Sequence, residues 1–271
     1  MSSDRKTGTP KDSHYARLRR AHRDSTREEG ERPDDGLVRL YGLHTVRAAL
    51  DNPARKSRRL LVTRNALARL DLSEPLSLPF PAEIVEPREI DRLTGPDAVH
   101  QGALLEAEPL RPKPLSALGD TNLILVLDQV TDPHNVGAIM RSAVAFGAGA
   151  LITTARHSPT ETGVLAKSAS GALEHIDHIE VRNLADALGE LHAAGFQTIG
   201  LDSEGPAEIE KSFSETRIAL VLGAEGKGLR QKTRETVSTL ARLDMPGAIR
   251  SLNVSNAAAV AMYAARKHLG A

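Results

Sequence analysis

Three stretches of the sequence place polar side chains and glycines next to predicted strands. They are DPHNVGAIMRSA at 132–143, LGAEGKGL at 222–229, and LDMPGAIRSLNVSN at 243–256. Each lies where a run of apolar residues that reads as a strand comes to its end. Ligands of open α/β sheets bind at the carboxyl ends of strands. Three such segments in one domain therefore predict a single binding site.

Familiar nucleotide and hydrolase motifs do not account for this site. No GxGxxG follows the first strand, and a phosphate loop would need Gly and Ser or Thr where the chain has Val221 and Gly228. No GxSxG nucleophile elbow is present. His175 and His178 have a spacing found in metal sites, but neither a cysteine nor a third ligand accompanies them. We interpret them as exposed loop histidines and expect no metal.

The polar residues of the first and third stretches admit two interpretations. Arg141, on a predicted helix over 137–147, could pair with Asp132 or Glu225, or its planar guanidinium could hold a phosphate or carboxylate of a substrate. Asn135, taken alone, is typical of a helix cap. The four polar residues within 251–256 directly precede AAAVAMYAA, and together they predict a polar site at the start of a closely packed helix.

The elements that position these residues follow from hydrophobic patterning. A first unit of about 70 residues, within the range of small domains, mixes helical and strand patterns. Its predicted helices and strands are a helix over 40–50, a strand over 57–63, a helix over 66–72, a strand over 82–86, a helix over 88–95 and a strand over 101–108. A proline-rich segment follows, and from residue 120 continuous apolar strands alternate with helices, as expected for a mostly parallel sheet covered on both faces. We predict a basic arm over 1–36, a substrate-binding domain over 37–108, a linker over 109–119 and a catalytic α/β domain over 120–271.

Composition narrows the class of protein. Of 271 residues, 40% are hydrophobic and 26% charged, with no cysteine and no apolar run long enough for a membrane span. No signal peptide is evident, so we expect a cytoplasmic protein without a membrane partner. Residues 5–23 contain seven basic side chains against one acidic side chain. This arm is typical of disordered sequence, and it serves equally as a solvated tail or as a contact to a phosphate backbone.

Taken together, the three stretches resemble the motifs of the SpoU (TrmH-like) family of RNA ribose 2′-O-methyltransferases, within the SPOUT class. The segment AKSASGALEH at 166–175 also resembles a family segment, and the likeness covers residues 120–271. The first unit is similar to the small ribosomal-protein-like RNA-binding domain of bacterial 23S rRNA guanosine methyltransferases. The resemblance implies a trefoil-knotted α/β domain, which composition alone does not predict because knots are rare.

The resemblance also implies roles for individual residues. The family's active-site positions fall on Asn135, Arg141, Glu225, Ser251 and Asn253. The pocket for its cofactor, S-adenosylmethionine, would be lined by Gly200, Leu201, Gly223, Leu243, Met245 and Leu252. One departure is Asp244, which stands where the family usually shows proline.

The partners implied are RNA and a second copy of the chain bound through the knotted domain. The extra N-terminal unit favours rRNA, and a guanosine of 23S rRNA in particular, over tRNA. Two alternatives stay open: a tRNA ribose methyltransferase of the same family, and an inactive RNA-binding factor in ribosome assembly. The five polar positions, all occupied, argue against an inactive site.

Overall fold

The computed structural model describes residues 36–72, 78–249 and 251–270. The predicted basic arm lies outside the described residues except for Gly36, and Arg250 of the third stretch lies outside them too. By packing, the chain divides into Met1–Leu37 and Val38–Ala271, and the second unit contains both sheets described below.

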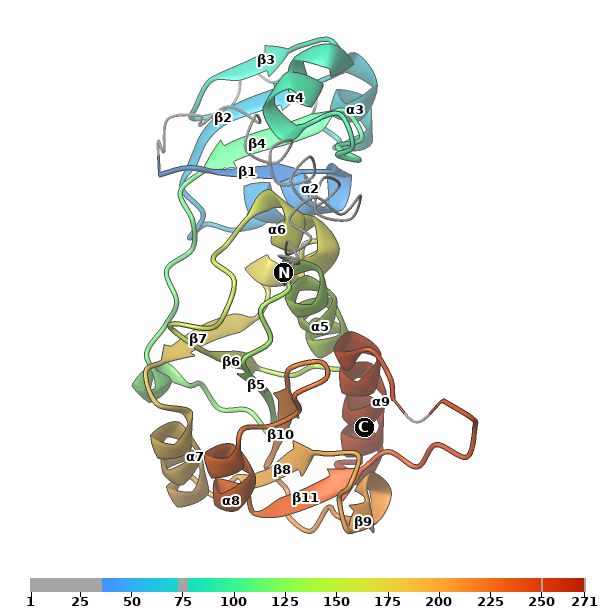
Figure 1. Cartoon of the computed structure of the whole chain (residues 1–271). Coiled ribbons are helices and arrows are strands. Elements are labelled where there is room, and N and C mark those ends of the chain that lie inside the picture. Colours follow the sequence, from blue (N-terminus) through green and yellow to red (C-terminus); the bar gives the residue numbers. More distant parts are fainter. Residues whose placement is uncertain (1–35, 73–77, 250, 271) are drawn as a thin grey trace, which may run out of the picture. The chain divides into compact units, whose positions relative to one another are not determined.

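The first sheet has four strands in the order β1-β4-β2-β3 (Figure 1). Strand β4 is central and runs antiparallel to β1 and β2, whereas β2 and β3 are parallel. We call this sheet and its helices the small domain. Its elements are β1 Val38–Tyr41, α2 Leu43–Asp51, β2 Ser57–Val62, α3 Arg64–Arg69, β3 Ala82–Ile84, α4 Pro87–Thr94 and β4 Ala103–Ala107. The strand β1 was missed by the sequence prediction, which assigned its last two residues to a helix; Gly42, with φ 90°, separates the two elements.

The second sheet has seven parallel strands in the order β7-β6-β5-β10-β8-β11-β9. We call this sheet and its helices the large domain. Its first half contains η2 Leu115–Ala117, β5 Leu123–Asp128, α5 Pro133–Ala145, β6 Ala150–Thr154, α6 Gly163–Ala169, η3 Ala172–Glu174 and β7 Asp177–Val181. Its second half contains α7 Leu184–Ala193, β8 Gln197–Leu201, β9 Ala207–Glu208, η4 Ile209–Lys211, β10 Ile218–Gly223, α8 Gln231–Thr236, β11 Thr239–Arg242 and α9 Val254–His268.

Alternate residues of the central strands point to opposite faces of this sheet. Leu123, Leu125 and Leu127 pack in the core cluster that contains residues of α5 and α9, while Ile124 and Val126 pack in the cluster of α7. Both faces of β5 are buried, which explains its unbroken apolar sequence. The predicted mostly parallel α/β sheet is confirmed.

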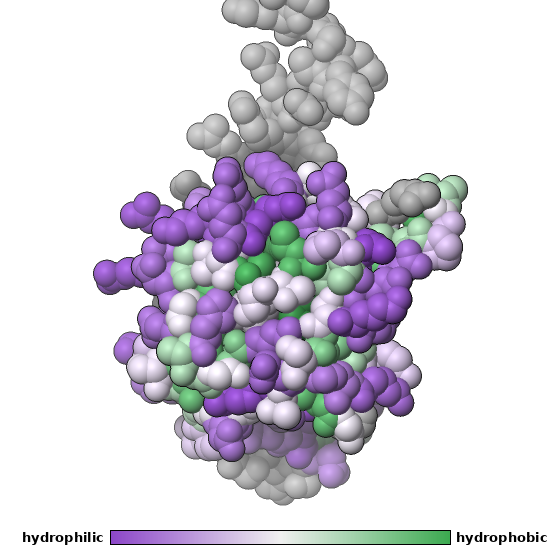
Figure 2. All heavy atoms as spheres, turned by 90° about the horizontal axis from the view of Figure 1, so that it is seen from below, coloured by the Kyte–Doolittle hydropathy of each residue, from purple (hydrophilic) through white to green (hydrophobic). Residues whose placement is uncertain are grey.

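The surface view agrees with the charged composition. The face seen from below in Figure 1 is dominated by hydrophilic residues, with smaller apolar areas between them (Figure 2). In the part of the chain that the structure describes, no helix is long and apolar enough to span a membrane.

Candidate active site

Side chains from all three sequence stretches meet at one point. The Nδ2 atom of Asn253 lies 2.6 Å from Oε1 of Glu225 and 2.9 Å from Oδ1 of Asn135. Asn135 Nδ2 lies 3.4 Å from the same Glu225 oxygen, which also accepts the backbone N–H of Val254 at 3.2 Å. Asn135 and Asn253 are 118 positions apart in the sequence. A single carboxylate oxygen therefore ties together the start of α5, the loop after β10 and the start of α9.

Asn135 does not cap its helix, contrary to the sequence interpretation. Helix α5 begins at Pro133, and the carboxylate of Asp132 accepts the backbone N–H of His134 at 3.0 Å as the cap. Proline is favoured at the first position of a helix because its missing N–H is not needed there. Asn135 thus lies in the first turn, and its side chain is available to Glu225 and Asn253.

Asn253 has two roles that fix its orientation. Its Oδ1 accepts the backbone N–H of Ser255 at 2.8 Å and caps α9, which begins at Val254. The Ser255 hydroxyl donates to the same oxygen at 2.5 Å. Because Oδ1 is used by the cap, the amide nitrogen must face Glu225 and Asn135.

The loop after β10 is folded tightly on itself. Gly228 N donates to Ala224 O at 2.8 Å, and Gly226 and Gly228 have φ of 74° and 65°. A Cβ on Gly223 would lie 2.1 Å from the carbonyl carbon of Gly228, so a side chain is excluded at that position. This close return of the backbone brings Glu225 to the end of the strand.

An ion pair between a buried carboxylate and an exposed arginine, which the sequence analysis missed, fixes the far end of this loop. Asp128, the last residue of β5, has a fully buried side chain that accepts from Arg230 Nε at 2.6 Å and from Arg230 N at 3.0 Å. The sequence contained a signal for this ion pair, because a single carboxylate ends the otherwise apolar run LILVLD. A buried carboxylate needs such a partner.

Arg141 stands apart from this network. It is exposed on α5, beyond the second turn of the helix. Among the described residues its guanidinium has no hydrogen bond or ion pair, and the two carboxylates considered for it, those of Asp132 and Glu225, are used elsewhere. Of the two interpretations that the sequence left open for Arg141, the ion pair with Asp132 or Glu225 is therefore not found in the described part of the chain. Ser251 is also exposed and does not join the hydrogen-bonded group.

Four of the six residues expected to line a cofactor lie at the carboxyl edge of the sheet. Gly200 on β8 is aligned with Val221 on β10 and Leu240 on β11, and Leu201 is aligned with Ala241. Gly223 ends β10, and Leu243 follows β11 directly. Gly200 is buried against Leu229, Leu240 and Val237.

The remaining two lie in the long connection between β11 and α9, which extends outward on the right of Figure 1. Met245 is half-buried, whereas Leu252 and the neighbouring Ile249 are 44% and 77% exposed. Exposed apolar side chains beside a polar hydrogen-bonded group fit a small ligand that has both apolar and polar parts. The site is therefore compatible with the adenosine and thioether portions of a sulfonium cofactor.

The histidine interpretation needs a correction at one position. His175 is exposed, but His178 lies within β7, is partly buried, and bonds through Nε2 to the hydroxyl of Thr153 at 2.8 Å. In the described ranges no group of three potential metal-ligating side chains is found.

Two family models match the chain. The SpoU rRNA Methylase family model matches residues 122–263, and the model for RNA 2′-O ribose methyltransferase substrate binding matches residues 39–113. These matches cover the large and the small domain.

Curated relatives are similar over most of their length. The 23S rRNA (guanosine-2′-O-)-methyltransferase RlmB of Pseudomonas putida is 36% identical over 239 residues, covering 84% of this chain and 96% of the relative. The corresponding protein of Ralstonia nicotianae is 38% identical over 234 residues, covering 83% and 94%.

Solved structures share the fold. The SpoU methyltransferase AviRb of Streptomyces viridochromogenes, determined with AdoMet, has a TM-score of 0.71 at 21% identity, covering 95% of this chain and 94% of that one. An AdoMet-bound rRNA methyltransferase of Sinorhizobium meliloti has a TM-score of 0.72 at 24% identity, covering 93% and 92%. With family models matched in both domains and relatives aligned almost end to end, the chain belongs to the SpoU rRNA methylase family.

Proposed function

We propose that this protein transfers a methyl group from S-adenosylmethionine to a ribose 2′-hydroxyl of RNA, and that its target is a guanosine of 23S rRNA. The observation that carries the proposal is the contact of Asn135, Glu225 and Asn253, which joins three distant motifs of a methyltransferase family at one point. The relatives named as 23S rRNA guanosine methyltransferases support the choice of RNA and of nucleotide.

The cofactor would be held at the carboxyl edge of the sheet, where it supplies a methyl group activated by a sulfonium. Backbone groups at Gly200, Leu201 and Gly223 would bind its polar parts, and Leu243, Met245 and Leu252 would cover its apolar parts. This placement leaves the polar group formed by Asn135, Glu225 and Asn253 beside the reacting atoms.

Arg141 would hold the RNA. A guanidinium holds its proton tightly and is therefore a poor general base. Its planar fork instead suits a phosphate next to the target ribose, and its charge would stabilise the alkoxide that develops as the 2′-hydroxyl attacks. Because Arg141 has no partner among the described residues, this role requires no ion pair to be broken. Asn135, Ser251 and Asn253 would orient the hydroxyl and Arg141, and Glu225 would fix the loop.

The second partner is another copy of this chain. Val260 and Tyr263 lie one turn apart near the middle of α9, at 45% and 54% exposure. An apolar stripe on a helix otherwise rich in alanine suits close packing against a second helix. We also propose a cytoplasmic location for the protein.

The test is methylation of purified RNA. Protein is incubated with S-adenosylmethionine labelled in its methyl group and separately with 23S rRNA or a tRNA pool, and modified riboses are mapped as sites resistant to alkaline cleavage. We expect one labelled guanosine in 23S rRNA. Labelling of tRNA alone would favour the tRNA methyltransferase. RNA binding with no labelling of either RNA would favour the inactive assembly factor.

A further inference from the structure

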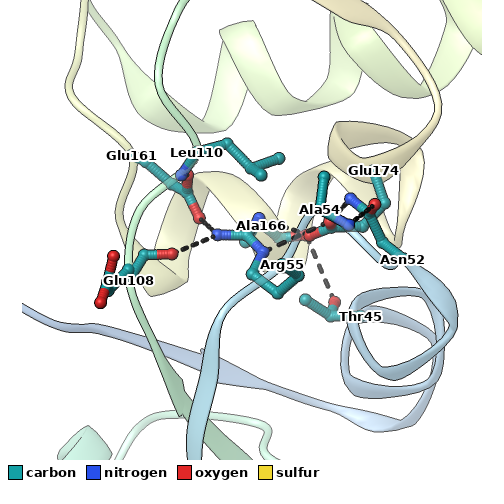
Figure 3. A network of polar contacts seen from close by, with 9 residues as sticks. All are labelled: Thr45, Asn52, Ala54, Arg55, Glu108, Leu110, Glu161, Ala166 and Glu174. Atoms are coloured by element: carbon teal, nitrogen blue, oxygen red, sulfur yellow. Dashed lines mark hydrogen bonds and ion pairs between the residues drawn. The ribbon is translucent and has the colours of Figure 1, made fainter.

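Arg55 forms a buried joint between the two domains. It lies between α2 and β2 of the small domain, and its side chain is 0% exposed. Its NH1 lies 2.6 Å from Glu161 Oε1 and its NH2 lies 2.5 Å from Glu174 Oε1. Both carboxylates belong to the large domain, one just before α6 and the other at the end of η3 (Figure 3).

Further hydrogen bonds surround the ion pairs of this joint. Arg55 NH1 also donates to the Glu108 carbonyl at 3.0 Å, and Arg55 Nε donates to Glu174 Oε2 at 3.3 Å. The backbone N–H of Leu110 donates to Glu161 Oε2 at 2.7 Å, and the amide of Asn52 donates to Glu174 Oε2 at 2.6 Å. A buried charge cluster is tolerated only where its donors and acceptors are matched in this way, so it selects one arrangement of the groups around it.

Glycines bring the backbones of the two domains close together around the joint. A Cβ on Gly163, the first residue of α6, would lie 2.3 Å from the Arg39 carbonyl oxygen in β1. A Cβ on Gly171 would lie 2.9 Å from Ala48 Cβ in α2. The hydroxyl of Thr45 also donates to the Ala166 carbonyl at 3.3 Å. Buried apolar residues of the small domain such as Leu40, Val46 and Leu105 belong to the same cluster as Leu165 and Ala169 of α6, whereas Leu61, Val85, Ile90 and Leu104 form a separate cluster.

The opposite side of α6 packs on the helix that carries the candidate site. A Cβ on Gly137 of α5 would lie 2.5 Å from the Leu165 carbonyl oxygen and 2.6 Å from Ser168 Cβ. His134 Nδ1 lies 3.2 Å from the hydroxyl of Ser168. Helix α6 therefore lies between the small domain and α5, which bears Asn135 and Arg141.

We propose that Arg55, Glu161 and Glu174 are positioning residues for RNA methylation: they fix the small domain on α6 at a set distance from Arg141. RNA held by the small domain then presents one ribose to the site. This inference rests on the proposed function and adds to it the means by which the target nucleotide is selected. The segment 166–175, which the motif comparison left without a role, becomes the surface that links substrate binding to chemistry.

A joint that serves stability alone makes a different prediction. Replacing a buried charge cluster by neutral groups of similar shape is often neutral or stabilising. The variant Arg55→Met/Glu161→Gln/Glu174→Gln should therefore stay folded while the arrangement of the domains is no longer fixed. If the joint did not position the RNA, this variant would keep both the stability of the wild type and its kcat/KM for 23S rRNA.

The arrangement of the domains can be measured directly because the chain has no native cysteine. Arg88 in α4 and Glu190 in α7 are both exposed, so each can be replaced by a cysteine that carries a spin label. The distance between the two labels reports the arrangement of the two domains. Labelled chains are diluted with unlabelled chains to suppress signals between copies. We expect one narrow distance distribution for the otherwise wild-type protein and a broad one for the triple variant. A broad distribution in the otherwise wild-type protein, or a narrow one in the triple variant, would overturn the proposal.

Methylation kinetics supply the functional readout. A displacement of the substrate by about 1 Å can reduce kcat/KM about 10²-fold, so we expect the triple variant to lose about tenfold or more in kcat/KM for 23S rRNA. Its affinity for S-adenosylmethionine, measured by calorimetry, should equal that of the wild type. An unchanged kcat/KM, or an equal loss of cofactor affinity, would contradict a positioning role.

A second variant leaves all charges of the joint in place. Gly163→Ala must push β1 away from α6 and should also reduce kcat/KM for 23S rRNA with cofactor affinity unchanged. Gly189→Ala is the matched control, because Gly189 lies within α7 and a Cβ there meets nothing within 4 Å. A wild-type kcat/KM for 23S rRNA in Gly163→Ala would count against the inference. Failure of the wild type itself to methylate RNA would instead refute the proposed function, and this is seen before any variant is made.

Discussion

The joint and the candidate active site each contain an arginine, and the two arginines differ in burial and in hydrogen-bonded partners. Arg55 is fully buried, and each of its guanidinium nitrogens is bonded to a carboxylate or carbonyl. Arg141 is exposed and, within the described part of the chain, has no hydrogen bond or ion pair. The charge of Arg55 is neutralised inside the protein, whereas that of Arg141 is available to a ligand. The comparison separates an arginine that organises the protein from one that can act on a substrate.

The strongest test of this difference is the single substitution Arg55→Met. It leaves two buried carboxylates without their cation, and removing one partner of a buried ion pair costs about 3–5 kcal/mol. We expect the free energy of unfolding to fall by that amount in urea titrations. Arg141→Met, at an exposed and unpaired position, should change it by less than about 0.5 kcal/mol. Equal losses in the two variants would remove the distinction.

The converse test is Arg141→Lys, measured by the rate of methyl transfer. A lysine keeps the charge but loses the planar pair of donors. We expect kcat to fall about 10²- to 10³-fold, the range seen when a donor to a developing oxyanion is removed. The midpoint of unfolding and the affinity for S-adenosylmethionine should not change. A folded variant with a near wild-type rate would show that Arg141 does not clamp the RNA.

Asn253 has a structural and a functional role that can be separated. Asn253→Ala should cost about 1 kcal/mol of stability through loss of the helix cap, and it should also slow methyl transfer. Asn183→Ala is the control, since Asn183 caps α7 through the same type of bond and lies outside the candidate site. Asn253→Asp keeps a capping oxygen but places a carboxylate beside Glu225, so activity should fall while stability is largely retained. Full activity in Asn253→Asp would argue against the role of the amide.

The smallest expected effect is the pH dependence of the joint. Burial raises the pKa of Glu161, and the attraction of Arg55 opposes this only in part. With the folded-state pKa above the unfolded value, the folded protein binds the proton more tightly, so this contribution to stability is present at low pH and is lost as pH rises through the folded-state pKa. Relative to Glu161→Gln, the wild type should lose stability as pH increases from about 4.5. A constant difference between the two proteins across this range would contradict the direction of the shift.

Much of the fold could be predicted from the sequence because its signals are local. The central strands β5 and β10 of the large domain are almost entirely apolar, and helix α4 ends at Thr94, one residue before the end that its pattern predicted. The order of the parallel strands could not be predicted in this way, because pairing of β10 between β5 and β8 depends on residues far apart in the sequence. The start of α5 was misplaced although its signals, Asp132 and Pro133, were present.

The candidate site was predicted through its motifs, and the joint was not predicted at all. Asn135, Glu225 and Asn253 lie in stretches whose polar residues and glycines are conspicuous next to apolar strands. Arg55 lies in the ordinary loop sequence NPARKS, and its carboxylate partners are more than 100 positions away. No local pattern distinguishes such an arginine from an exposed one, because only the tertiary structure determines whether its donors are satisfied.

The strand order of the large domain also bears on how the chain is made. Leu123 of β5 pairs with Ile218 of β10. The ribosome must therefore add about 95 residues after Leu123 before the edge of β5 that faces β10 is covered. Until then one side of a strand that is apolar except for its last residue has unpaired backbone groups, an arrangement prone to association with other chains. Nascent chains that end before residue 218 should therefore aggregate or recruit chaperones, and chains extended through β10 should be the first to become resistant to proteolysis in this domain.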